Sequence, residues 1–487
     1  MVFSSLVFLY LFLPCSLILY YFLGSKFRHA IAADGTTDPG APTEAQNYIL
    51  IAVSLFFYAW GEPIWVSLLV LTAFVDWVAA LWMERTRGTN GPKFALALSL
   101  VSNLSLLGVF KYSDFFVENI NTTLGASFNL PGYALPIGIS FYVFQTLSYS
   151  VDVYRGDVRA QRRFMDFLLY VSLFPQLVAG PIVRYVHIAA EIRGRRHSWE
   201  LFSRGLHRLC VGLFKKVFIA NVAGEWAQRT MGGDLTALST GDAWLGLAMF
   251  TLQIYFDFSA YSDMAIGLGM MFGFHFNENF NYPYISKSVT EFWRRWHISL
   301  STFFRDYVYI PLGGGRHRPF RNLFIVWALT GFWHGASWNF MLWGLYFGVW
   351  IAIERIFLGR LLEKLPALFG HVYLLFIVTV GWGLFYFTDL QQLATFLRIL
   401  FALDGVPLLG EQTLSDLQAH SLWIPLALVA CTPVAPWLAA RALRVRVVCL
   451  VAGWRPIVTL AVDVVLLLSC TALLVGQSYN PFLYFRF

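Results

Sequence analysis

The chain has 487 residues, of which 58% are hydrophobic, 18% aromatic and only 13% charged, and its mean hydropathy is +0.60. A soluble domain of ordinary composition is about one quarter charged, so this composition excludes a soluble protein and predicts a polytopic membrane protein. The net charge of +7 lies in short basic segments between apolar runs, a pattern that favours a lipid bilayer over nucleic acid as the partner. Five scattered cysteines lack the spacing of a metal site or a disulfide framework, and we expect no metal.

Apolar segments that could span a bilayer occur at 3–23, 47–60, 63–83, 94–110, 135–150, 164–183, 205–222, 242–274, 322–354, 371–388, 421–440 and 456–476. We expect an all-helical protein with roughly eleven transmembrane spans and additional re-entrant helices, folded as a single domain over residues 1–487. The first segment lacks the features of a signal peptide, so we expect it to remain as a first span. Breaks are expected at Gly61-Glu62-Pro63 and at Ala179-Gly180-Pro181.

The basic clusters predict the orientation of the chain in the membrane. The strongest lie at 193–216, 287–321 and 441–446, and we expect them to face the cytoplasm, with both chain ends outside. The stretch 24–46 is expected to be a polar loop without chemistry.

One histidine, His334, lies within a long apolar run between Arg321 and Arg355. A helix from Arg321 reaches the histidine after about 18 Å, whereas a bilayer core is about 30 Å thick. The whole run is too long for one straight span, and Gly331 and Gly335 favour a break at the histidine, beside a cavity. An ionisable group at such a depth indicates a functional site, and the alternative is a hydrogen-bonded contact between helices.

The region 277–321 is aromatic and basic, and we expect it to be a re-entrant or interfacial region on the cytoplasmic side, followed by a membrane segment over 322–354. Ser288 and Glu291 resemble a capping box, which predicts the start of an amphipathic helix. That helix would carry Phe292, Trp293, Trp296 and Leu300 at helical spacing. Two interpretations stay open, an interfacial helix anchored in the headgroups and a vestibule for a charged cofactor.

Arginines are frequent in this region, at positions 294, 295, 305, 316, 318 and 321. Their guanidinium groups suit phosphate binding, while the alternative is a topological or lipid-facing role. Gly313-Gly314-Gly315 lacks the context of a phosphate loop and predicts a turn.

Two acids, Asp257 and Asp263, lie in the apolar segment 242–274. Six residues at about 100° each place them on different faces of a helix, which argues against a carboxylate pair. We expect a structural role for Asp257, whereas for Asp263 a structural role and the orientation of a catalytic histidine both stay open.

Several long motifs resemble the membrane-bound O-acyltransferase family, in the branch that contains the membrane subunit of bacterial alginate O-acetylation. They are WRRWHISLSTFFRDYVYIPLGG, GFWHGASWNFMLWG, PIGISFYVFQTLSYSVDVYRGD and YFDFSAYSDMAIGLG, and the two chain ends are also similar. The resemblance implies a helical ring around a central tunnel. It implies that His334 is the catalytic histidine and His297 the second one. Further residues expected at the tunnel or the donor site are Trp296, Arg294, Arg295, Arg305, Asp306, Trp333 and Asp263.

The resemblance also implies a reaction. An acetyl group would pass from acetyl-CoA, or a thioester derived from it, across the bacterial inner membrane to an exopolysaccharide, with alginate as the first expectation. No permanently bound cofactor is implied, and the implied partners are periplasmic SGNH-type O-acetyltransferases. The alternatives are the same role for cellulose or another exported glycan and, in a different class, a proton-coupled transporter or glycan exporter.

The residue chemistry fits acyl transfer. Burial disfavours an imidazolium, so we expect His334 to act as a neutral general base for the attacking hydroxyl group. His297 would position the donor or the acceptor, or polarise the thioester carbonyl. An acetyl-histidine intermediate also stays open.

Overall fold

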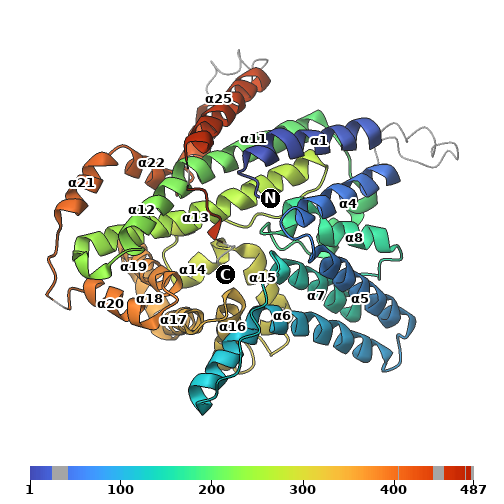
Figure 1. Cartoon of the computed structure of the whole chain (residues 1–487), viewed down its shortest axis with the longest axis horizontal. Helices are drawn as coiled ribbons and strands as arrows, with labels where there is room; N and C mark the ends of the chain where they lie inside the picture. The colour runs from blue at the N-terminus through green and yellow to red at the C-terminus, as the bar shows by residue number, and fades with distance from the viewer. Residues whose placement is uncertain (25–41, 404, 443–454, 478, 484–487) are drawn as a thin grey trace. The chain divides into compact units, whose positions relative to one another are not determined.

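The computed structural model describes residues 1–24, 42–403, 405–442, 455–477 and 479–483, and in these ranges the regular elements are helices, as expected (Figure 1). The chain divides into two compact units. Unit 1 comprises residues 1–210 and 261–278, and unit 2 comprises residues 211–260 and 279–487. Two of the boundaries fall within helices, α11 (Trp199–Phe214) and α13 (Thr240–Met271). The polar loop expected at 24–46 and the basic cluster expected at 441–446 lie largely outside the described residues.

The other helices of unit 1 are η1 (Phe8–Phe12), α1 (Leu13–Ile18), η2 (Leu19–Leu23), α4 (Glu44–Ala59), α5 (Val66–Arg85), α6 (Gly91–Leu124), α7 (Ile139–Arg155), α8 (Phe164–Ser172), α9 (Phe174–Leu177) and α10 (Tyr185–Gly194).

The other helices of unit 2 are η4 (Lys215–Ala220), α12 (Asn221–Met231), η5 (Leu235–Ala237), η6 (Pro283–Ile285), α14 (Val289–Arg295), α15 (Ile298–Phe304), η7 (Arg305–Tyr309), α16 (Pro319–His334), α17 (Trp338–Ile353), η8 (Glu354–Leu358), α18 (Gly359–Lys364), α19 (Ala367–Tyr386), α20 (Leu390–Leu400), α21 (Glu411–Ala419), α22 (Trp423–Ala430), α23 (Val434–Ala442) and α25 (Arg455–Gly476).

Five helices among the described residues are long and apolar enough to cross a membrane. They are Val66–Arg85, Gly91–Leu124, Trp338–Leu362, Ala367–Tyr386 and Pro456–Gly476. The expected first span corresponds to a shorter apolar helix, Phe8–Leu23. The protein is therefore an integral membrane protein with several spanning helices, as the composition predicts.

Both predicted helix breaks of unit 1 are present. Helix α4 ends at Ala59 and α5 begins at Val66, on either side of Gly61-Glu62-Pro63. Helix α9 ends at Leu177, before Ala179-Gly180-Pro181, and a further break at Leu173 separates it from α8. Proline and glycine thus end helices here where the sequence predicts.

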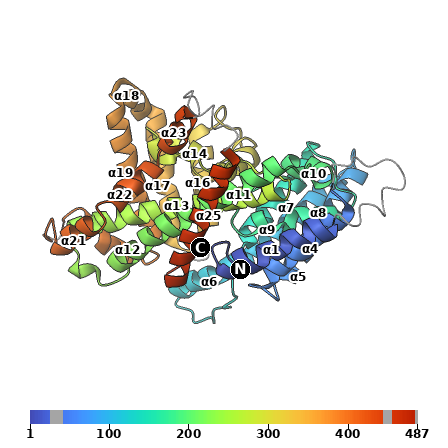
Figure 2. The ribbon, with the colours of Figure 1, turned by 90° about the horizontal axis from the view of Figure 1, so that it is seen from above.

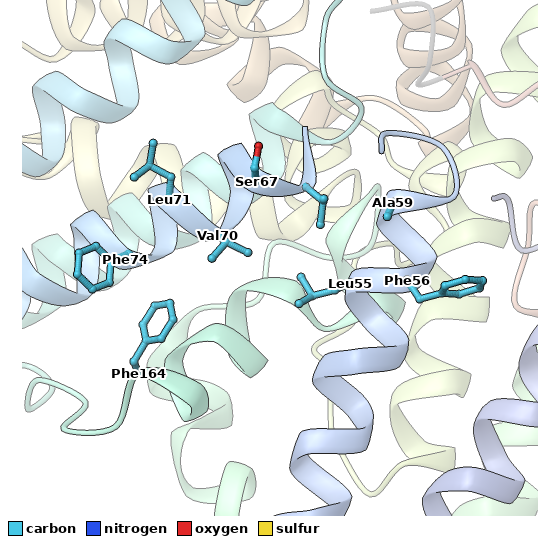
Figure 3. A pocket seen from close by; sticks show the side chains of 9 residues that line it. Leu55, Phe56, Ala59, Ser67, Val70, Leu71, Phe74 and Phe164 are labelled. Atoms are coloured by element: carbon cyan, nitrogen blue, oxygen red, sulfur yellow. The ribbon is translucent and has the colours of Figure 1, made fainter. Parts of the chain in front are cut away.

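Helices α4, α5 and α8 lie side by side in unit 1 (Figures 1 and 2). An open groove of about 810 Å³ lies between α4 and α5, and Phe164 lies next to Phe74 among the side chains that line it, as Figure 3 shows. Its walls are apolar apart from Ser67. A groove of this composition suits contact with lipid chains.

A buried polar network joins α5, α6 and α7 in unit 1. The Asp76 carboxylate accepts hydrogen bonds from Ser99 Oγ (2.5 Å) and from Asn103 Nδ2 (2.9 and 3.0 Å). Thr146 Oγ1 of α7 donates to Asn103 Oδ1 at 3.1 Å. Since these side chains have hardly any exposed surface, the network fixes the three helices against one another.

The core of unit 2 is rich in tryptophan. The rings of Trp293, Trp296, Trp327, Trp343 and Trp382 are buried, and neighbouring pairs have centroids 4.8 to 6.4 Å apart. Most of these pairs meet at an angle, as aromatic quadrupoles favour. The cluster joins helices α14, α16, α17 and α19 around the region that the sequence singles out.

The segment 479–483 is tied to η4 and α13 of unit 2 through a buried ion pair. Lys216 Nζ lies 2.6 Å from Asp257 Oδ1, and the two side chains are 3% and 2% exposed. Asp257 Oδ2 accepts a hydrogen bond from the backbone N–H of Leu483 at 2.8 Å, and Lys216 also donates to the carbonyl oxygen of Pro481. The structural role expected for Asp257 is confirmed.

Candidate active site

Helices α16 and α17 form a hairpin, with the connection at residues 335–337. A side chain at Gly331 would place its Cβ 2.4 Å from the carbonyl oxygen of Phe340, and one at Gly344 would lie 2.4 Å from that of Trp327. The two glycines therefore allow the backbones to meet closely. The predicted break is confirmed, because the apolar run folds back at the histidine instead of crossing as one helix.

His334 is the last residue of α16. This helix has 16 residues, so it is about 24 Å long and shorter than a bilayer core of about 30 Å. The half-buried imidazole is enclosed by the rings of Trp343, Trp333 and Phe385, with centroids at 4.7, 4.9 and 5.6 Å. Its surroundings are therefore largely apolar and rigid.

The hydrogen bond of His334 defines which ring nitrogen is basic. Nδ1 lies 2.7 Å from the carbonyl oxygen of Thr330, one turn earlier in α16. A carbonyl oxygen only accepts, so Nδ1 carries the proton and Nε2 holds the lone pair of the neutral ring. Nε2 is the nitrogen that can accept a proton from a substrate.

His297 lies at a kink that the sequence does not predict. The expected helix begins correctly, because Ser288 Oγ accepts the N–H of Glu291 at 3.0 Å, but it ends at Arg295. A second helix, α15, starts at Ile298, and His297 between them has a φ of 43°. The single helix expected to run through Trp296 to Leu300 is therefore wrong.

A loop 18 residues earlier holds the side chain of His297. Its Nδ1 lies 3.1 Å from Asn279 Oδ1, and the ring of Phe258 packs edge-on at 4.7 Å. The imidazole is 1% exposed, and no described residue forms a hydrogen bond with Nε2. His297 thus resembles His334 in having Nδ1 engaged by an oxygen acceptor.

Trp333 lies against both histidines. Its ring centroid is 6.2 Å from that of His297 and 4.9 Å from that of His334. Burial lowers the pKa of His297, which lies outside the candidate spans, to well below its ordinary value, and nearby His334 lowers it further when His334 itself is protonated. His297 is therefore neutral near pH 7. The structure brings together His297, Trp333 and His334 from the predicted set.

The other predicted site residues have different surroundings. Trp296 is 4% exposed and packs in the tryptophan cluster, 4.8 Å from Trp382. Asp263 belongs to unit 1, where it pairs with Arg208 at 2.8 Å. Its expected link to a catalytic histidine stays a prediction.

The predicted arginines differ in their partners. Arg294 is exposed, Arg295 pairs with Glu291 at 2.9 Å, and Arg305 pairs with Asp306 at 2.6 Å. The hydrogen bond with Asp306 raises the pKa of Arg305. Arg294 and Arg305 are both exposed, but Arg305 is engaged with Asp306, which leaves Arg294 the best placed of these for an anionic group from solution.

The turn after these arginines forms as predicted. Gly313 and Gly314 have φ values of 106° and 58°, which favour glycine. Nδ2 of the fully buried Asn322 lies 2.7 to 3.1 Å from three carbonyl oxygens of the turn, those of Leu312, Gly314 and His317. The turn is therefore a fixed structural feature. Within the described ranges, no group of three or more His, Cys, Asp or Glu side chains is arranged to hold a metal ion.

Sequence reasoning missed two residues that support the site. Asn279 orients His297, and Glu354 at the end of α17 accepts the backbone N–H groups of Val289 (2.5 Å) and Thr290 (2.9 Å) at the start of α14. Glu354 thereby fastens the hairpin to the helix that precedes His297. An acid at the end of a long apolar run was the available signal for Glu354. For Asn279 the only signal in the sequence was its position in the polar segment NENFN.

Comparison with known proteins identifies the family. The model of the membrane-bound O-acyltransferase family matches residues 158–393, which include both histidines and Asn279. The probable alginate O-acetylase AlgI of Pseudomonas putida is 40% identical over 508 residues, with 100% of both chains covered. This chain belongs to the membrane-bound O-acyltransferase family.

Other family relatives act on different polymers, according to their names. The peptidoglycan O-acetyltransferase of Helicobacter pylori is 32% identical over 84% of this chain and 81% of its own. The teichoic acid D-alanyltransferase of Bacillus subtilis is 27% identical over 45% of this chain and 59% of its own. The family resemblance drawn from the motifs is confirmed, and the protein is an O-acyltransferase of the membrane.

Proposed function

We propose that the protein is the membrane subunit that passes acetyl groups from a cytoplasmic donor to an exported polysaccharide, and that this polysaccharide is alginate. The observation that carries the proposal is similarity along the whole chain. Probable alginate O-acetylases of Pseudomonas putida and Azotobacter vinelandii are 40% and 39% identical, each with 100% of both chains covered. The peptidoglycan O-acetyltransferase, at 32% identity, makes peptidoglycan the second acceptor to test.

His334 is the proposed general base. Its Nε2 accepts the proton of the attacking hydroxyl group while the hydroxyl oxygen forms a bond with the acetyl carbon. The bond from that carbon to the thioester sulfur then breaks, and the imidazolium returns its proton to the thiolate. General base action of this kind contributes roughly 10² to 10⁴ fold. The Nδ1–H bond to Thr330 supports the assignment, since it presents the required lone pair.

The donor in this proposal is acetyl-CoA or a thioester derived from it. Exposed Arg294, together with Arg295 and the Arg305–Asp306 pair, would form the donor side, where a guanidinium can bind phosphate groups. Trp296 and Trp333 would shape the wall near the thioester, and Asp263 stays a predicted residue of the donor site or the tunnel. The role of each of these residues rests on its position in the family motifs.

The proposed setting is the bacterial inner membrane, with about eleven spans and re-entrant helices around a tunnel that reaches His334 from both faces. Periplasmic SGNH-type O-acetyltransferases would complete the transfer to the polymer. The shortness of α16 supports this arrangement, because a helix of 16 residues that ends at the histidine leaves that residue inside the membrane.

Complementation tests the proposal. An alginate producer that lacks its own membrane O-acetylase would receive this chain or its His334→Ala variant, at matched membrane levels, and the acetyl content per sugar would be measured. We expect the wild-type chain to restore acetylation of the alginate and the His334→Ala variant not to restore it. Restored acetyl content with both chains would refute the role of His334. Unacetylated alginate with acetylated peptidoglycan would reassign the acceptor, and a change in exported polymer without any acetyl transfer would favour the exporter alternative.

A further inference from the structure

We propose that Asn279 is a positioning residue that holds His297 in one tautomer, with its Nε2 as a hydrogen-bond acceptor for an O–H or N–H group of the substrate. The inference rests on the proposed function, in which His297 contacts the substrate. It excludes the other role considered for this histidine, because a neutral ring with Nε2 unprotonated cannot polarise a thioester carbonyl.

The hydrogen bonds of Asn279 define its orientation. Its Oδ1 lies 3.2 Å from the backbone nitrogen of Ser299, 2.9 Å from Ser299 Oγ and 3.1 Å from His297 Nδ1. A backbone N–H only donates, so the atom that faces it must be the amide oxygen. The same oxygen faces His297, and Nδ1 of that ring therefore carries the proton.

The backbone holds the same arrangement. Ile298 is the residue after the kink, and its backbone N–H donates to the carbonyl oxygen of Asn279 at 2.9 Å. His297 has a φ of 43°, in a region that costs a residue with a side chain about 1 kcal/mol or more. Contacts from Asn279 with the strained residue and with the two residues after it stabilise this conformation. Such strain at a histidine is more typical of a functional site than of a structural core.

The other ring nitrogen of His297, Nε2, has no hydrogen-bond partner among the described residues. Nε2 is buried and no described residue forms a hydrogen bond with it, although leaving a buried polar atom unsatisfied costs about 1 to 3 kcal/mol. The ring of Trp333 contacts both this imidazole and that of His334. A substrate O–H or N–H between the two histidines would satisfy Nε2. Two sources fit this chemistry, the hydroxyl-bearing acceptor and the amide groups of the thioester donor.

Burial and the neighbouring His334 keep His297 in the state that the proposal requires. Both lower its pKa, so the neutral ring persists at neutral pH and is lost only when the pH falls through the lowered value. A negative charge at position 279 would have the opposite effect, because it stabilises the imidazolium. The acid limb of the pH profile also contains the protonation of His334, the general base, so the contact between Asn279 and His297 is read from the shift of the limb in an Asn279 variant and not from its position in the wild type.

The first test uses the purified full-length protein in nanodiscs with radiolabelled acetyl-CoA and measures acetyl release and transfer against pH. Asn279→Asp should move the acid limb to higher pH by about one unit or more. The matched control is Asn281→Asp, the same change at an exposed residue of the same loop, which should leave the limb unchanged. An unmoved limb in a folded Asn279→Asp protein would overturn the proposal.

A double-mutant cycle separates positioning from general structure. Asn279→Ala should lower kcat about tenfold in the wild-type chain, the effect of one hydrogen bond, but less than twofold in a His297→Gln chain. Equal losses in both backgrounds would show that Asn279 acts without His297. A rise in KM for acetyl-CoA would assign the bonded group to the donor, whereas an unchanged KM with lower kcat would assign it to the acceptor.

A spectroscopic test needs no activity. Solid-state ¹⁵N NMR of histidine-labelled protein, with His297 assigned by its loss in His297→Gln, should show the Nδ1-protonated tautomer in the wild type. An Nε2-protonated signal would refute the inference whatever the assay gives. Conversely, full acetyl transfer by His334→Ala would refute the proposed function while leaving the tautomer of His297 as measured.

Discussion

The imidazole of His334 donates its Nδ1–H to the carbonyl oxygen of Thr330, at a distance of 2.7 Å and within the same helix. The ring is thus oriented by the backbone of its own helix. This arrangement gives the base one defined tautomer and adds no second charge to a largely apolar site. The chemistry of the site should therefore depend on Nε2 of this residue.

Replacing His334 by alanine should lower acetyl transfer by about 10² to 10⁴ fold, because the general base is lost. The measurement is acetyl release from radiolabelled acetyl-CoA by purified protein. His371→Ala is a matched control, since Nδ1 of His371 also lies near a backbone carbonyl oxygen, that of Ser286 at 3.1 Å. A similar loss in both variants would point to packing instead of base catalysis.

Alanine at Gly331 or Gly344 should separate α16 from α17. Each new Cβ would lie 2.4 Å from a carbonyl oxygen of the facing helix, so the backbones must move apart, at a cost of about 1 to 3 kcal/mol. Thermal unfolding in detergent and acetyl transfer should both decline. Gly383→Ala is the control, because its Cβ would meet Leu247 at 3.6 Å, an ordinary contact, and unchanged unfolding for all three variants would contradict the close packing.

Glu354→Ala should destabilise the start of α14. It removes the acceptor for Val289 N, for Thr290 N and for Thr290 Oγ1, which lies at 2.6 Å, so we expect a loss of about 3 kcal/mol. Glu354→Gln keeps one acceptor oxygen and should lose less. The measurement is the unfolding of purified protein, and Glu363→Ala is the control at a nearby exposed residue. Equal stability of Glu354→Ala and Glu354→Gln would argue against the hydrogen bonds.

The Lys216–Asp257 pair should behave as a buried ion pair. Lys216→Met leaves an uncompensated carboxylate and should cost about 3 to 5 kcal/mol of the free energy of unfolding. The double variant Lys216→Met/Asp257→Leu should recover most of this loss, because it removes both charges. Additive losses in the double variant would show that the two side chains act independently.

Local sequence signals predicted the parts of the site that depend on near neighbours. Ser288 was predicted as the N-cap of α14, and the break at Gly335 was predicted from glycine within an apolar run. The pairing of Arg295 with Glu291 follows helical spacing but was not predicted, because the arginine was assigned to phosphate binding or to a topological role. In each case the deciding interaction lies within a few residues.

The kink at His297 depends on a longer-range contact. The sequence from Val289 to Phe304 has continuous helical periodicity, and nothing in it marks an end at Arg295. The kink is held by Asn279, which is 18 residues away and reads as an ordinary polar loop residue. Such a contact exists only in the folded chain, which is why pattern reasoning extended the helix through the second histidine.

The contact between Asp257 and Leu483 also has a consequence for the order of synthesis. The two residues are 226 positions apart in the chain. Synthesis proceeds at about 5 to 20 residues per second, so the backbone N–H of Leu483 is made about 10 to 45 s after the carboxylate that accepts its hydrogen bond. During that interval, of the contacts described above, only the ion pair between Asp257 and Lys216 can form. A chain that stops before Pro481 never receives the carbonyl and the amide that complete the pair, so an interrupted product keeps two buried charges with fewer hydrogen bonds.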